Sequence, residues 1–374
     1  MSTEGGLYIG LMSGTSMDGV DGVLVEFSAT GRVKNLLAHH HQPFEPALRD
    51  ALVALQAPGH DELHRAAMAA NSLVRVYAAV VESLVQRARI DPQGVLCVCA
   101  HGQTVRHRPE LGYTWQINNP ALLAELTRMP VVADLRARDI AAGGQGAPLV
   151  PAFHQAVFSK QNRSRLIVNL GGICNVTLLH GTDHAVGYDI GPANVLLDLW
   201  VHQHLGEPFD RNGAWASIGE VDDELLDVLL AEPFFKLKPP KSTGRDLFHA
   251  QWLHDKLAAF GHLAPEDVQR TLVELTAVLI AEQAEGSNPP ISEVVLCGGG
   301  TYNLTLREAL QARLADLASA PRLKLSSELG IAAEHVEAMA FAWLGWCHLN
   351  DVPANLPEAT GAVDERVLGS YTPD

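Results

Sequence analysis

Residues 14–21 read GTSMDGVD and lie between two apolar runs, residues 7–12 and residues 20–27. The runs predict two strands joined by a turn that carries glycine, hydroxyl and carboxylate groups. Glycine lets backbone N–H groups approach an anion, hydroxyls donate to phosphate oxygens, and a carboxylate such as Asp18 or Asp21 holds metal-bound water. The segment therefore predicts a phosphate-binding turn, although an ordinary hairpin uses the same residue types. Its members are Gly14, Thr15, Ser16, Met17, Asp18, Gly19, Val20 and Asp21, and Asp18 is the expected metal ligand.

A strand that runs into glycines occurs twice more in the chain. Residues 165–179 read RLIVNLGGICNVTLL, and residues 293–303 read EVVLCGGGTYN. Between them, Asp189 ends a short predicted strand, and Pro192 is expected to open a helix over residues 195–204. An acid at a strand end that faces a helix N-terminus is a common place for chemistry in α/β proteins.

Several short motifs together identify a family, although each one alone is weak. The chain resembles the anhydro-N-acetylmuramic acid kinases, a branch of the sugar kinase, heat-shock ATPase and actin superfamily. The resemblance implies an α/β fold with two RNase H-like domains, each a mixed sheet flanked by helices. The motifs that carry it are MSGTSMDGVD, HGQT, AAGGQGAPLVP, NLGGICN, YDIGPAN, KSTGR, VLCGGGTYN and EAMAF.

The resemblance also implies a reaction. ATP and water would convert 1,6-anhydro-N-acetylmuramic acid into N-acetylmuramic acid 6-phosphate and ADP, with Mg²⁺ as cofactor and cell-wall recycling as the cellular role. Two other functions stay open at this point. One is a related kinase that acts on a free sugar hydroxyl, and the other is a non-catalytic nucleotide switch of the actin type.

By resemblance, Asp189 is the general base that activates the attacking water; the alternative is a carboxylate that caps the following helix. Glu337 shares a helix face with apolar residues, so its carboxylate needs a partner. It either positions the substrate or pairs with a buried arginine such as Arg138.

Thr104 and Arg138 match family positions that hold the amino sugar, and a guanidinium fork suits a carboxylate. For Arg138 the alternative is a structural ion pair with Asp134 or Asp139. His101 is expected to be a hydrogen-bonded structural histidine and not a base.

The remaining assignments concern the nucleotide. Residues 241–245 resemble a family loop near the nucleotide, or begin a basic helix without a ligand. The expected second phosphate loop consists of Gly171, Gly172 and Asn175, and the adenosine loop of Gly298, Gly299 and Gly300.

Composition is that of an ordinary globular protein: 374 residues, 47% of them hydrophobic, are enough for two cores. The formal charge of −16 argues against nucleic acid or an anionic membrane surface as a partner. With no targeting or membrane-spanning segment recognised, we expect a cytoplasmic protein. Its five cysteines are expected to be reduced core thiols, and the family implies a homodimer.

We place one domain at residues 1–135 plus 354–374 and the other at residues 136–353. The first would contain the first phosphate turn and part of the sugar site. The second would contain the second phosphate loop, the adenosine loop and Asp189. The charged segment 134–139 and the glycines that follow it are the expected hinge.

Overall fold

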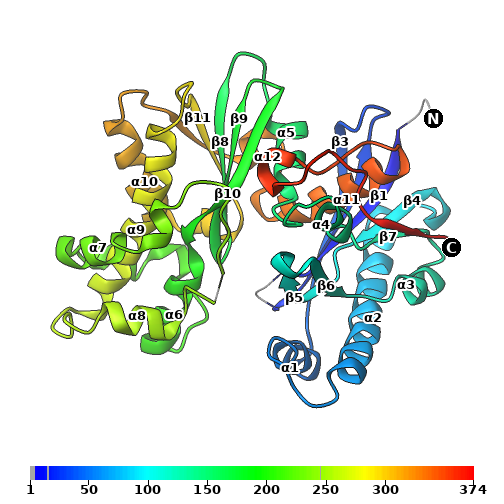
Figure 1. Cartoon of the computed structure of the whole chain (residues 1–374), viewed down its shortest axis with the longest axis horizontal. Coiled ribbons are helices and arrows are strands. Elements are labelled where there is room, and N and C mark those ends of the chain that lie inside the picture. Colours follow the sequence, from blue (N-terminus) through cyan, green and yellow to red (C-terminus); the bar gives the residue numbers. More distant parts are fainter. Residues whose placement is uncertain (1–4, 15–16, 245) are drawn as a thin grey trace. The chain divides into compact units, whose positions relative to one another are not determined.

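The computed structural model describes residues 5–14, 17–244 and 246–374. They divide into two compact units, Met1–Val157 with His335–Asp374, and Phe158–Glu334 (Figure 1). These boundaries differ from the predicted ones, which were placed after residues 135 and 353. The segments in question stay with the first unit because α11 (Val336–Leu349) packs on its sheet and Phe153 of α5 (Val150–Phe158) contacts Trp343 of α11.

The first unit is built on a six-stranded mixed sheet with the order β13-β7-β4-β1-β2-β3. β1 pairs with β2 in antiparallel and with β4 in parallel orientation. Its strands are β1 (Gly6–Met12), β2 (Gly19–Phe27), β3 (Val33–Pro43), β4 (Val95–Ala100), β7 (Val131–Ala133) and β13 (Ser370–Thr372), with a separate hairpin of β5 (Gln103–Arg108) and β6 (Tyr113–Ile117). Its other helices are α1 (Pro46–Ala54), α2 (Glu62–Ala88), α3 (Pro120–Thr127), α4 (Ala137–Ala141) and α12 (Pro357–Thr360).

Helices cover both faces of this sheet, and two glycines allow the close approach. A Cβ on Gly10 of β1 would lie 2.1 Å from the carbonyl oxygen of Ala338 in α11. On the next strand, a Cβ on Gly22 would lie 2.3 Å from Val80 of α2. The sheet is therefore enclosed between α11 and α2, which agrees with its apolar strands.

Helix α2 is long and apolar enough to cross a membrane by length and composition alone. Half of its most apolar window is buried inside the unit, and its side chains Leu73, Val74 and Tyr77 belong to the core. These contacts are those of a core helix.

The second unit has a five-stranded mixed sheet with the order β10-β9-β8-β11-β12. β8 pairs with β9 in antiparallel and with β11 in parallel orientation, as β1 does with β2 and β4. Its elements are β8 (Ser164–Leu170), β9 (Ile173–His180), β10 (His184–Pro192), β11 (Glu293–Cys297), β12 (Arg322–Leu325), α6 (Asn194–Leu205), α7 (Asp223–Leu230), α8 (Ala250–Lys256), α9 (Pro265–Glu285) and α10 (Leu304–Asp316). The shared strand order confirms the predicted fold class of two RNase H-like α/β domains.

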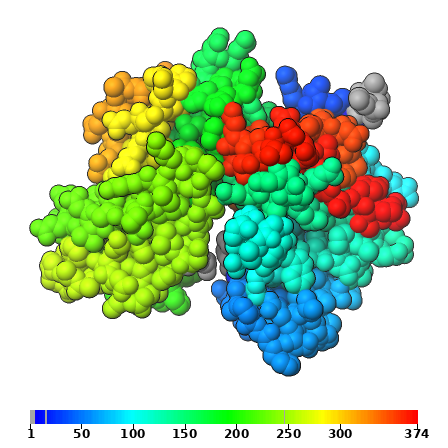
Figure 2. All heavy atoms as spheres, viewed as in Figure 1, coloured from blue at the N-terminus to red at the C-terminus, as the bar shows by residue number. Residues whose placement is uncertain are grey.

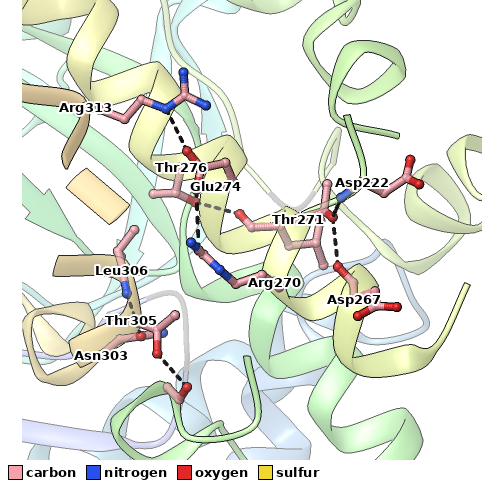
Figure 3. Close-up of polar contacts among 12 residues, drawn as sticks. Asp222, Asp267, Arg270, Thr271, Glu274, Thr276, Asn303, Thr305, Leu306 and Arg313 are labelled. Atoms are coloured by element: carbon pink, nitrogen blue, oxygen red, sulfur yellow. Dashed lines mark hydrogen bonds and ion pairs between the residues drawn. The ribbon is translucent and has the colours of Figure 1, made fainter. Parts of the chain in front are cut away.

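Helix α9 forms the centre of the second unit and is buried on most sides, with Leu272, Leu275 and Leu279 in the core. Its buried carboxylate Glu274 accepts from Arg313 of α10 at 2.7 Å and lies 3.4 Å from Arg270 (Figure 3). A buried carboxylate needs such partners, and the Arg313 contact fixes α10 against α9.

The C-terminal residues, coloured red in Figure 2, lie at the surface of the first unit, where β13 pairs with β7. One local prediction was wrong. Pro192 was expected to open a helix, but it ends β10, and α6 begins at Asn194. The five free cysteines are buried, as expected.

Candidate active site

The first glycine turn joins β1 to β2, as its sequence predicts. The Met17 N–H donates to the Gly14 carbonyl oxygen at 3.2 Å, and Met17 has a positive φ of 52°. Asp18 is exposed, and its carbonyl oxygen accepts from the Phe44 N–H at 3.0 Å. Gly19 and Val20 are buried at the start of β2. The assigned residues Thr15 and Ser16 lie outside the described part of the chain.

Residues 101–103 support the start of this turn. The Ser13 hydroxyl donates to the Gly102 carbonyl oxygen at 3.0 Å, and the Gln103 side chain donates to the Gly14 carbonyl oxygen at 3.1 Å. Gly102 has a φ of +81°, which favours glycine. The HGQ part of the HGQT motif therefore positions the turn through the backbone.

His101 is neutral and structural. One ring nitrogen, Nδ1, lies 3.2 Å from the Ser13 carbonyl oxygen, so it carries the proton and donates. The other, Nε2, accepts from Nε and Nη2 of Arg136 at 3.1 and 3.0 Å. Burial, followed by the Arg136 charge, lowers the pKa of His101 to about 3. The expectation that His101 is not a base agrees with this geometry.

Arg136 is a site candidate that the sequence analysis missed. Burial lowers the pKa of its guanidinium to about 10, and the charges of Glu337 and Asp139 act in the opposite direction. The arginine that interacts with the Glu337 charge is therefore Arg136, which is partly buried, whereas the sequence suggested Arg138 for this role. The role of Arg136 could not be predicted from the sequence, because residues 134–139 resemble one cluster of solvent-exposed charges.

Glu337 lies in the first turn of α11, where the helix dipole favours a carboxylate. One turn further along, Phe341 contacts the His101 ring at a centroid distance of 4.9 Å. Glu337 thus belongs to the same cluster as Arg136 and His101, at the end of β4 beneath the first turn.

Arg138 is exposed on α4, and the expected structural pair with Asp139 does not form. The Asp139 carboxylate instead accepts from Asn355 and Thr360, each at 2.7 Å, and from the Gly146 N–H. Those bonds hold the segment expected to be a hinge within the first unit.

Thr104 is half-buried in β5. Its hydroxyl accepts from the Gln116 amide at 3.2 Å, and its carbonyl oxygen accepts from the Gln56 amide at 3.1 Å. Thr104, Arg138 and Glu337, the three expected sugar contacts of the first half, therefore lie in one unit.

Asp21 lies on β2 and is held by two histidines of β3. Its Oδ1 atom is 3.0 Å from His41 Nδ1 and 3.3 Å from His39 Nε2. Burial opposes ionisation, but the hydrogen bonds and charges of the two histidines prevail and lower the pKa of Asp21 to about 2. The Asp21 bond in turn raises the pKa of His41. Asp21 is thus a firmly ionised carboxylate.

Asp189 lies on β10, in register with Asn175 of β9, which is in register with Asn169 of β8. Directly paired residues share a face of the sheet, so the three form one polar row. Burial raises the pKa of Asp189, against the effect of hydrogen bonds from Thr243 and Ser242. A half-buried carboxylate with a raised pKa is suited to accept a proton.

Two further glycine loops lie in the same unit as Asp189. The carbonyl oxygens of Gly171 and Gly172 accept from Asn194, Ala193 and Val195 at the start of α6. Gly298 has a φ of +81°, and a Cβ there would lie 2.4 Å from Asn169 Oδ1. A Cβ on Gly300 would lie 2.7 Å from Leu170, whereas one on Gly299 would meet nothing within 4 Å.

Asp189, Asn175 and these glycines are therefore brought together in the second unit.

Within the described ranges of the chain, there is no group of three or more histidine, cysteine or acidic residues that fits a metal ion. The Asp18 side chain is exposed, and a carboxylate is the type of oxygen donor that Mg²⁺ accepts alongside water and phosphate.

Comparison with known proteins adds the family. Residues 6–374 match the model described as anhydro-N-acetylmuramic acid kinase. Proteins of that name from Paraburkholderia xenovorans and Bordetella petrii are 53% and 52% identical to this chain. The first match covers 98% of both chains, and the second covers 100% of this chain and 98% of the relative. A solved dehydratase activator from Clostridium difficile overlaps 92% of this chain and 96% of its own at 11% identity, and its TM-score of 0.46 is too low to bear on function.

Proposed function

The chain belongs to the anhydro-N-acetylmuramic acid kinase family and is an ATP-dependent kinase, and we propose that its sugar substrate is 1,6-anhydro-N-acetylmuramic acid. The products are N-acetylmuramic acid 6-phosphate and ADP, as in the recycling of cell-wall sugars. Family membership over the whole chain favours this reaction over a kinase for free hydroxyls and over a non-catalytic switch.

We propose Asp189 as the general base, and its surroundings carry this proposal. The carboxylate takes a proton from water while the water oxygen bonds to C1 of the sugar. The bond from C1 to the bridging oxygen breaks, and that oxygen, now on C6 alone, attacks the γ-phosphorus of ATP. The bond to the β-phosphate oxygen breaks, and ADP leaves. Burial supports this role because it disfavours the ionised carboxylate and so increases its basicity.

The glycine loops are proposed to hold ATP. Gly14, Thr15, Ser16, Met17, Gly19, Val20 and Asp21 would surround the terminal phosphates, with Gly171, Gly172 and Asn175 as the second phosphate loop and Gly298, Gly299 and Gly300 beside the adenosine. Asp18 would hold Mg²⁺, which neutralises phosphate charge when bound. The open space above Gly299 supports a ligand at the third loop.

Thr104, Arg138 and Glu337 are proposed to hold the sugar. Arg138 is exposed and belongs to no ion pair among the described residues, so its guanidinium is available for the lactyl carboxylate of the substrate. Glu337 is the proposed second catalytic carboxylate, and its charge interacts with that of Arg136. We further propose a cytoplasmic homodimer.

The test is ADP release measured with and without the anhydro-sugar, together with phosphorus NMR of the product. We expect sugar-dependent release of ADP and a phosphate on O6. In heavy-oxygen water the label should appear on C1 and not in the phosphate. ADP release that does not depend on the sugar, or label found in inorganic phosphate, would contradict the proposed reaction.

A further inference from the structure

Residues 241–243 follow the turn η5 (Pro233–Lys236) and surround one side of Asp189. The Ser242 hydroxyl donates to Asp189 Oδ2 at 3.1 Å, and the Thr243 N–H donates to the same oxygen at 2.9 Å. The Asp189 N–H donates to the Lys241 carbonyl oxygen at 3.2 Å. Three consecutive residues therefore fix both the backbone and the carboxylate of one side chain.

Lys241 ties the loop to η5. Its ammonium donates to the carbonyl oxygens of Phe235 at 3.1 Å and Phe234 at 3.3 Å, and it lies 4.7 Å from the centre of the Phe234 ring. The ring of Phe235 packs against Gly191, where a Cβ would come within 2.8 Å of it. Because the register of β10 shifts between Asp189 and Gly191, the loop and η5 hold the strand on both sides of that irregularity.

The two oxygens of the Asp189 carboxylate differ in their hydrogen bonds. Both donors bond to Oδ2, and no residue in the described part of the chain donates to Oδ1. An oxygen with two donors is a poor proton acceptor, since protonation would displace a donor. Oδ1 is the better acceptor.

We propose that the loop of residues 241–243 is a positioning element for the general base, with Ser242 as a positioning residue that makes Oδ1 the proton-accepting atom. This rests on the proposed function, which supplies the role of Asp189. It also gives the KSTGR motif a function apart from the nucleotide.

The groups around Asp189 determine in which direction its pKa should move when the Ser242 hydroxyl is removed. Lys241 favours its ionised form, and Glu282 of α9 faces Lys241. From β9, the Cys174 thiol is adjacent but is neutral, because burial raises its pKa. Hydrogen bonds to a carboxylate lower its pKa, so removal of the Ser242 hydroxyl should raise the pKa of Asp189.

The experiment is the pH profile of kcat/KM for Ser242→Ala, Ser242→Thr and the control Ser217→Ala. Ser217 is exposed in the same unit and donates to the Ala214 carbonyl oxygen at 2.8 Å, without a bond to Asp189. We expect the acid limb of Ser242→Ala to move upward by roughly 0.5–1 pH unit, with kcat reduced and KM for ATP unchanged. Ser242→Thr should restore the limb, and Ser217→Ala should not move it.

An unmoved acid limb in Ser242→Ala would overturn the inference, and so would a changed KM for ATP with constant kcat. Asp189→Asn separates this failure from failure of the proposed function: if that variant keeps turnover, the base is another group and both proposals fall. Thermal unfolding of each variant shows whether the fold is kept. Because Ser242 is exposed, we expect the unfolding temperature of the Ser242 variants to stay close to that of the parent protein.

Discussion

Asp21 and Asp189 lie in sheets of the same strand order, yet their surroundings shift their carboxyl pKa values in opposite directions. Asp21 faces two histidines and has a pKa of about 2. Asp189 receives two hydrogen bonds from a loop, but burial dominates and raises its pKa. The sheets position both carboxylates, and the neighbouring side chains decide what each can do.

The difference indicates a division of labour. A carboxylate that stays ionised is suited to organise charge, whereas one with a raised pKa is suited to take a proton. The first unit would then organise phosphate and metal, and the second would supply the base. The two sheets can serve both roles because different segments supply the contacts: β3 supplies those of Asp21, and the loop of residues 242–243 supplies those of Asp189.

The largest expected effect is that of Asp189→Asn. The amide is nearly isosteric but cannot take the proton from water, so turnover should fall about 10²–10⁴-fold. Steady-state kinetics and a nucleotide-binding titration check this, and nucleotide affinity should persist. The matched change Asp21→Asn should reduce turnover less than Asp189→Asn does, because Asp21 is proposed to organise phosphate charge and not to take the proton. An equal loss of turnover in both variants would contradict the proposed division of roles.

Asp18→Ala should have the next largest effect. Loss of a carboxylate that supports a metal through its waters typically costs about 10–100-fold in metal affinity or activity. A titration of activity with Mg²⁺ should show a raised requirement, while sugar binding by calorimetry is retained. An unaltered Mg²⁺ curve would leave Asp18 with a structural role in the turn.

Gly298→Ala should be destabilising, because the backbone there has a φ of 81° and a ψ of 170°, and the new Cβ would meet Asn169 and Leu170. We expect a loss of about 1–3 kcal/mol in the free energy of unfolding, measured by denaturant titration. Gly299→Ala is the control, since a Cβ there meets nothing within 4 Å. It should keep stability but raise KM for ATP, and an unchanged KM would separate this loop from the nucleotide.

Asp21→Asn should have the smallest effect, a loss of about 0.5 kcal/mol in stability, because the pair is partly exposed. The depressed pKa of Asp21 means that its contribution is present above pH 3.8 and is lost as the pH falls toward about 2. The raised pKa of His41 means that its contribution is present below 6.5 and is lost as the pH rises through the raised value. Denaturant titrations should therefore show a larger loss near pH 5 than near pH 9, and a pH-independent loss would contradict the pairing.

The sequence predicted the strands and the glycine turns well, because apolar runs and glycines are local signals. It missed β5, whose consecutive polar residues 106–108 resemble a loop. It also suggested Arg138 as the arginine that pairs with Glu337, whereas Arg136 has that place. Both arginines belong to one charged segment, and only the contact of Arg136 with His101 distinguishes them.

The contacts of Asp189 were also beyond the sequence. Ser242 and Thr243 are 53 and 54 residues away along the chain, and no periodicity connects such positions. The motif KSTGR indicated that the loop had a purpose, but only the fold brings residues 241–243 to β10.

The most direct test of the account is carbon NMR of the aspartate carboxyl groups in protein labelled at that carbon. Asp189→Asn and Asp21→Asn assign the two resonances. As the pH is lowered from about 8 to about 4, the Asp189 signal should begin to shift while the Asp21 signal stays at its ionised position. An Asp21 carboxyl that titrates before Asp189, or an Asp189 carboxyl that stays fully ionised at about pH 4, would contradict the assignment of Asp189 as the base.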